Sequence, residues 1–66
     1  MQANTFQNIG PGDTVRFSNR FGQERNGRAV MFNRQYQAWV LNAGGPHGTP
    51  KIVDATNFVR IVRKAR

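Results

Sequence analysis

Apolar and polar residues alternate along most of the chain, and turn-forming residues interrupt this alternation at short intervals. A period of two places successive side chains on opposite faces of a β-strand. No segment carries apolar residues at the spacing of an amphipathic helix. The pattern therefore predicts an all-β protein built from short strands.

The first predicted strand covers residues 14–19. Its alternation places Val15 and Phe17 on the inner face and Arg16 on the outer face. A glycine-containing loop over residues 20–26 then leads to the second strand.

The second predicted strand, residues 27–33, alternates in the same way. Val30 and Phe32 share one face, and Ala29 and Met31 share the other. We expect both faces of the strand to be at least partly covered.

A short turn leads to the third predicted strand, residues 36–42, which is rich in aromatic and β-branched residues. Its alternation places Trp39 and Leu41 opposite to Tyr36, Ala38 and Val40. Trp39 lies in the middle of this strand, and we expect it to be buried.

Glycine and proline dominate residues 43–50, which predicts a long loop without regular structure. A short strand follows at residues 51–54. Residues 54–57 predict a single turn of 3-10 type, and residues 58–63 predict the last strand. The remaining residues, 64–66, are predicted to form a frayed basic tail.

This layout resembles a five-stranded SH3-like small barrel with one 3-10 turn before the last strand. The predicted organisation is an irregular N-terminal segment (residues 1–11), the barrel (residues 12–63) and the basic tail. The chain has 66 residues, which is room for one domain.

Two segments resemble the KOW motif, namely Gly12-Asp13-Thr14-Val15 and, after a basic glycine-containing loop, Gly27-Arg28-Ala29-Val30. KOW modules are associated with RNA binding in ribosomal proteins and transcription factors. The resemblance implies a KOW-type or Tudor-type barrel that binds nucleic acid.

Two further families share this architecture. Gly22 and Gly27, followed by Phe32-Asn33, are similar to the first motif of Sm-like RNA-binding proteins, in which an Asp replaces Asn33. The turn Thr56-Asn57-Phe58-Val59 looks like the one that precedes the last strand of signalling SH3 domains. Those domains bind basic peptides through an acidic loop, and the loop here is basic, so only their fold is implied.

An enzyme, type II dihydrofolate reductase, also resembles the chain. The similarity lies in a Gly-Asp-x-Val-Arg strand at residues 12–16, a Gly-x-x-Val strand at residues 27–30 and the loop Pro46-His47-Gly48. That enzyme acts as a tetramer with a shared pore, and its Val-Gln-Ile-Tyr segment is replaced here by Pro50-Lys51-Ile52-Val53. The resemblance leaves a homo-oligomer open but removes the pore-facing glutamine and tyrosine.

Catalytic and metal-binding residue patterns are absent from the sequence. There is no cysteine and only one histidine, His47, which lies in the glycine-proline loop without a neighbouring acid. Ser18 has no base and acid at recognisable positions. We therefore predict a protein that is not an enzyme and needs no metal or cofactor.

Charge points to the class of partner. The chain carries ten Lys and Arg against three Asp and Glu, a formal charge of +7, and such a field attracts polyanions. Nucleic acid is the predicted partner, and an acidic protein remains the alternative because carboxylates also satisfy Arg. The candidate contacts are Arg16, Arg20, Arg25, Arg28 and Arg34 in or beside the first hairpin, with Lys51, Arg60 and Arg63 as a second patch.

Two aromatic residues are candidates for base stacking. Phe21 lies in the basic loop and Tyr36 lies just after the turn between the second and third strands. Cover over the core is the alternative role for both rings. The sequence shows no apolar run long enough to span a membrane and no export signal, so we expect a cytoplasmic protein.

Overall fold

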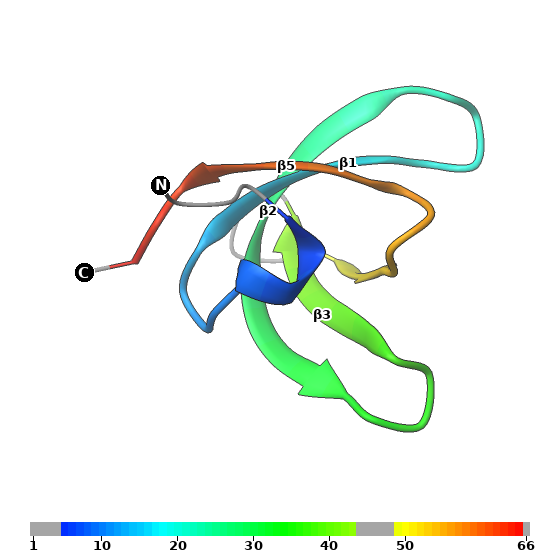
Figure 1. The fold of residues 1–66 in the computed structure, drawn as a ribbon. Coiled ribbons are helices and arrows are strands. Elements are labelled where there is room, and N and C mark those ends of the chain that lie inside the picture. Colours follow the sequence, from blue (N-terminus) through cyan, green and yellow to red (C-terminus); the bar gives the residue numbers. More distant parts are fainter. Residues whose placement is uncertain (1–4, 44–48, 66) are drawn as a thin grey trace.

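Residues 5–43 and 49–65 are described by the computed structural model. A short 3-10 helix, η1 (Phe6–Asn8), precedes five strands: β1 (Thr14–Ser18), β2 (Glu24–Asn33), β3 (Ala38–Ala43), β4 (Thr49–Val53) and β5 (Phe58–Arg63). All pair antiparallel in one sheet of order β4-β3-β2-β1-β5 (Figure 1). The predicted all-β class and the five strands are confirmed.

Strand bounds differ from the prediction where pairing overrides local turn preference. β2 begins at Glu24 because the first residues of this strand pair with β1, with Glu24 opposite Ser18. The expectation of irregular structure over residues 43–50 is wrong at both ends, since Ala43 ends β3 and Pro50 lies in β4. Proline is tolerated there because β4 is the outermost strand of the sheet.

The predicted 3-10 turn before the last strand is also wrong. In the described part of the chain the 3-10 helix is η1, which precedes β1. Residues 54–57 instead form a turn organised by two side chains. The Asp54 carboxylate accepts the Asn57 N–H at 3.2 Å, and the Asn57 side chain accepts the Asp54 N–H at 2.8 Å. Asp and Asn side chains that mimic backbone turns in this way need no helical turn.

A bulge in β2 alters the faces predicted for this strand. Its pairing with β3 shifts between Ala29 and Met31. Ala29 is buried, Val30 and Met31 are both exposed, and Phe32 packs against the core. The predicted sharing of a face by Val30 and Phe32 is wrong because a bulge sets two residues of one strand against one of its neighbour.

The core lies on the inner face of the bent sheet. Figure 1 shows β2 curving along its length, so that β1 and β5 run across the end of the molecule opposite to the turn between β2 and β3. Trp39 is only 8 % exposed, which confirms its predicted burial. Its ring packs edge-to-face on Phe32, with 5.6 Å between the two ring centres. The buried cluster comprises Ile9, Val15, Phe17, Ala29, Trp39, Leu41, Val53 and Ile61.

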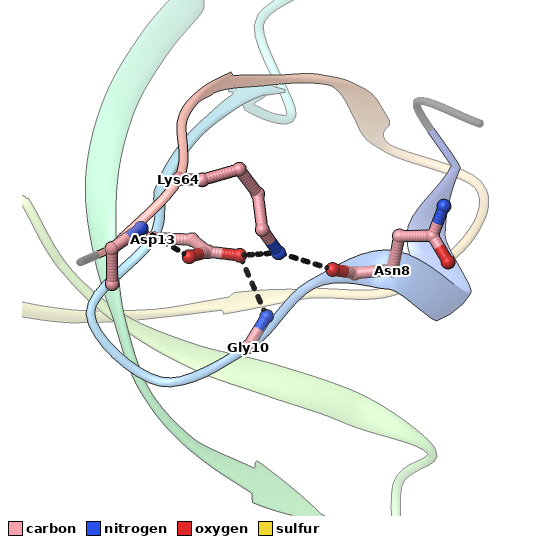
Figure 2. A network of polar contacts seen from close by, with 5 residues as sticks. Asn8, Gly10, Asp13 and Lys64 are labelled. Atoms are coloured by element: carbon pink, nitrogen blue, oxygen red, sulfur yellow. Dashed lines mark hydrogen bonds and ion pairs between the residues drawn. The ribbon is translucent and has the colours of Figure 1, made fainter. Parts of the chain in front are cut away.

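A polar network joins the start of the sheet to the end of the chain (Figure 2). Asp13 is 1 % exposed, and its carboxylate accepts hydrogen bonds from Gly10 N–H at 2.8 Å, Lys64 Nζ at 2.6 Å and Ala65 N–H at 2.7 Å. Lys64 Nζ also donates to the carbonyl oxygen of Asn8 at 2.7 Å. These five residues form the Asp13 network. Lys64 and Ala65 are therefore held against the sheet, so the predicted fraying of the tail is wrong for these two residues.

Burial raises the pKa of the Asp13 carboxyl, because the anion loses contact with water. Hydrogen bonds from the Ala65 N–H, the Lys64 ammonium and the Gly10 N–H oppose this effect and outweigh it. The net result is a pKa below the ordinary value of an aspartate, so Asp13 is an anion at neutral pH.

Candidate nucleic-acid interface

The sheet register gathers arginines from three strands on the outer face. Val15 and Phe17 of β1 point into the core, so Arg16 points outward. Directly opposite residues of antiparallel strands share a face. Arg60 of β5 lies opposite Arg16. Thr14 of β1 has Arg28 of β2 opposite it on one side and Arg63 of β5 on the other. Arg16, Arg28, Arg60 and Arg63 are the arginine face.

One member of the arginine face is paired and the other three are open. Arg16 Nε lies 2.6 Å from Glu24 Oε1, and Arg16 Nη1 donates to Asn26 Oδ1 at 3.0 Å. Arg28, Arg60 and Arg63 are exposed. Within residues 5–43 and 49–65, none of these three forms an ion pair. Their guanidinium groups are thus available to an anionic ligand.

The three acidic residues of the chain are all engaged in intramolecular contacts. Asp13 is held in its network, and Glu24 binds Arg16. The side-chain hydroxyl and the N–H of Thr56, with further backbone donors, lower the pKa of Asp54 against the opposing effect of burial. The acids therefore leave most of the basic surface unneutralised.

The turn between β1 and β2 carries a second group of predicted contacts. Residues 19–23 form this β1–β2 tip, drawn in cyan in Figure 1. Phe21 is the most exposed of the large apolar side chains that are described, at 78 %. The Arg20 guanidinium lies 5.8 Å from the centre of its ring, and Arg25 Nη2 donates to Gln23 Oε1 at 3.2 Å.

The turn between β2 and β3 lies at the other end of β2. Residues 34–37 form this β2–β3 tip, drawn in green in Figure 1, and it carries Arg34 and Tyr36. Both are exposed, and the Tyr36 N–H donates to Asn33 Oδ1 at 3.1 Å. A strand rises about 3.3 Å per residue, so β2, from Glu24 to Asn33, separates the two tips by up to roughly 30 Å along its path.

The predicted contacts therefore fall into separate groups. Arg16 and Arg28 from the first predicted patch join Arg60 and Arg63 from the second. Arg34, which was predicted with the first patch, lies instead at the β2–β3 tip, away from the arginine face. Lys51 lies on β4, at the other edge of the strand order from β5, so the register does not join it to the arginine face.

An exposed apolar row was not predicted. Met31, Val40 and Ile52 lie directly opposite one another on β2, β3 and β4, and Met31 and Ile52 are each more than half exposed. The bulge at Val30 turns Met31 outward, and alternation alone gives no sign of it. The outer face is thus basic over β1 and β5 and apolar over β3 and β4.

Other candidate chemistry finds no support within the residues that the structure describes. His, Cys, Asp and Glu nowhere gather in threes that could hold a metal ion. The Ser18 hydroxyl donates to the Asn19 carbonyl at 3.4 Å. His47 and most of its loop, residues 44–48, lie outside the described residues. No described helix has the length and apolar character needed to cross a membrane.

Comparisons of the chain with known protein families, with curated proteins and with solved structures find no match. A functional proposal for this chain therefore depends on the chemistry of its own surface.

Proposed function

We propose that this chain is a non-catalytic module that binds the phosphate backbone of RNA or DNA. The observation that carries the proposal is the arginine face, where Arg28, Arg60 and Arg63 stand open beside Arg16. All three carboxylates of the chain are engaged elsewhere or with Arg16, so they do not cancel the charges of Arg28, Arg60 and Arg63. Each phosphate that an arginine neutralises releases condensed counterions, which favours binding regardless of base sequence.

The arrangement of the face also suits an anionic ligand. Arg16 and Arg60 lie directly opposite each other, and like charges in this position destabilise a sheet. Glu24 offsets part of this repulsion through its ion pair with Arg16, and a phosphate bound by Arg60 adds a second negative charge beside the pair. The planar guanidinium donates two parallel hydrogen bonds to phosphate oxygens, which a lysine ammonium does not do.

We also propose that the sheet closes into an SH3-like barrel of KOW or Tudor type. The five short antiparallel strands and the bend at the β2 bulge support closure, because bulges at such positions allow a sheet to curl. An experimental structure tests this. Hydrogen bonds or close side-chain contacts that join the two edges of the sheet are expected, and their absence contradicts it.

A salt titration of binding tests the proposed function. Single-stranded RNA, single-stranded DNA and duplex DNA are titrated beside an acidic polypeptide. Each phosphate contact contributes about −0.7 to −0.9 to the slope of log affinity against log salt. Arg28→Ala, Arg60→Ala and Arg63→Ala are each expected to flatten the slope by about that amount or less. Arg34→Ala at the β2–β3 tip is the matched control and is expected to change it less.

Two results count against the proposal. Absence of measurable affinity for any nucleic acid at about 50 mM salt, where electrostatic attraction is strong, rejects nucleic-acid binding. An equal effect of Arg34→Ala and Arg60→Ala rejects the arginine face as the contact surface.

The second candidate is a protein-interaction module for an acidic partner. The apolar row of Met31, Val40 and Ile52 favours it, because exposed apolar patches mark protein contacts. Under this alternative, binding depends on one or two residues and responds more weakly to salt. Ile52→Thr is then expected to weaken binding of the acidic polypeptide more than Arg63→Ala does. For a backbone-tracking module the order is reversed.

A further inference from the structure

We propose that Phe21 stacks on an unpaired base and that the chain therefore prefers single-stranded over duplex nucleic acid. This inference rests on the proposed function and specifies the class of nucleic acid that the same surface takes.

The main chain of the β1–β2 tip is fixed around Phe21. Asn19 Oδ1 accepts the N–H groups of Phe21 at 2.9 Å and Gln23 at 3.0 Å. The Asn19 N–H donates to the Gln23 carbonyl at 2.8 Å, and the Gly22 N–H donates to the Asn19 carbonyl at 3.0 Å. Gly22 takes φ +78, which a side chain rarely adopts. The tip is thus held in one conformation while the ring at its end points away from the core.

The Phe21 ring has no role in the core. It is absent from the buried cluster and from the apolar residues that pack against that cluster. An aromatic ring left in water at the tip of a hairpin contributes nothing to folding through burial. It is, however, well placed to contribute to binding, because a ligand can cover it without any rearrangement of the sheet.

Cationic groups flank the ring. The Arg20 guanidinium lies over it at 5.8 Å from the ring centre, and Arg25 is held beside the tip by Gln23. Proteins that bind single strands combine cations for the phosphates with an aromatic platform for the bases. Bases in a duplex already stack on one another, so a protruding ring reaches a base face only after unstacking it. The combination at this tip therefore favours a single strand.

The β2–β3 tip offers a matched control. It also has an asparagine that holds the turn, an arginine and an exposed aromatic ring, in Asn33, Arg34 and Tyr36. The outer face next to it is the apolar row, whereas next to the β1–β2 tip the outer face carries Arg16 and Arg60 beyond the pair Ser18 and Glu24. Tyr36→Ala thus removes a similar ring at a place where the proposal predicts no base.

The experiment measures affinity for a single-stranded DNA oligonucleotide and for the corresponding duplex, with the full chain. Phe21→Ala is expected to weaken single-strand binding about 5- to 150-fold, which is the effect of losing one base stack. Duplex binding and the salt slope are expected to change less than about two-fold, because no phosphate contact is lost. Phe21→Trp is expected to retain the preference, and Tyr36→Ala is expected to leave it unchanged.

A spectroscopic readout separates stacking from a general loss of affinity. In the Phe21→Trp variant the new indole is exposed while Trp39 stays buried. Its fluorescence is expected to be quenched by a single strand and not by a duplex. Because Phe21 is outside the core, unfolding curves of the variants are expected to match that of the parent chain.

The results also separate this inference from the proposed function. Salt-dependent binding with equal affinity for single strand and duplex, or with equal weakening of both by Phe21→Ala, overturns the inference alone. Absence of binding to either nucleic acid overturns both.

Discussion

The Asp13 network and the arginine face use charge in opposite ways. Asp13 is buried, and its carboxylate accepts hydrogen bonds from three residues. Two of these, Lys64 and Ala65, follow the last strand. Arg28, Arg60 and Arg63 are exposed. Arg60 lies opposite another arginine, and the other two lie opposite the uncharged Thr14. The comparison indicates that Asp13 holds the fold together, while Arg28, Arg60 and Arg63 have no acidic partner among the described residues. Substitutions in the two regions should therefore separate stability from binding.

The largest expected effect is that of Asp13→Ala. The variant leaves the Gly10 and Ala65 N–H groups and the Lys64 ammonium without their acceptor. A hydrogen bond to a charged group contributes about 1.5–3 kcal/mol, and the variant loses the bonds that Asp13 accepts from Gly10, Lys64 and Ala65. A domain of this size has little more stability than that, so we expect the variant to be largely unfolded at 25 °C by circular dichroism. Lys64→Met removes a side chain that is 45 % exposed and keeps the Gly10 and Ala65 hydrogen bonds to Asp13, so it is the milder variant and should remain folded in urea titrations.

Acid should act on the same network. The folded-state pKa of Asp13 is lowered, so its contribution to stability is fully present above the unfolded-state pKa of about 4. It is lost as the pH falls through the folded-state pKa, because the protonated carboxyl no longer binds Lys64 as an anion. The melting temperature is expected to fall below about pH 4. In Lys64→Met this fall should be smaller, because the folded-state pKa of Asp13 then lies closer to the unfolded-state value, and an unchanged profile would show that Lys64 does not act on Asp13.

Substitution of two glycines, Gly12 and Gly22, is expected to lower stability by an intermediate amount, and each serves as the control for the other. Gly12 and Gly22 both have positive φ, at +88 and +78, so a side chain is strained at either place. Only at Gly12 would an added Cβ meet another atom closely, the Cβ of Ala65 at 3.0 Å, next to the Asp13 network. Gly22→Ala should cost about 1 kcal/mol of unfolding free energy and Gly12→Ala up to about 3. Equal costs in denaturant titrations would show that Ala65 moves aside easily.

Local patterns predicted the elements of this fold better than their connections. Alternation identified five strands, the bounds of β5 and the burial of Trp39, because each depends on neighbours in sequence. The bulge at Val30 depends on how β2 pairs with β3, and alternation within β2 carries no sign of that pairing. Asp13 was singled out only as part of a motif, and its partners Lys64 and Ala65 lie 51 and 52 residues away, where no local pattern connects them to it.

The candidate site shows the same limit. Charge identified the arginines, and the loop position made Phe21 a candidate for stacking or for cover over the core, of which the structure leaves the ring exposed. Sequence proximity then grouped Arg34 with Arg28, although the length of β2 separates the two tips. Only the register of β1 with β5 brings Arg60 beside Arg16. Grouping by sequence fails here because a sheet places segments that are distant in sequence side by side. It also fails because the two ends of one long strand lie far apart.

The smallest expected effect comes from the arginine face itself. Arg60 lies opposite Arg16, whose charge Glu24 partly offsets, so removing the Arg60 charge in Arg60→Thr should raise the unfolding free energy by at most about 0.2–1 kcal/mol at low salt. The gain should vanish at high salt, where exposed charges are screened. Arg34→Thr, at a turn without an opposite arginine in the register, is the control and should leave stability unchanged. Urea titrations at two salt concentrations measure this, and the same variant should bind nucleic acid more weakly. Should Arg60→Thr instead destabilise the fold by more than about 1 kcal/mol, Arg60 serves the structure as Asp13 does, and the contrast between the two regions fails at that residue.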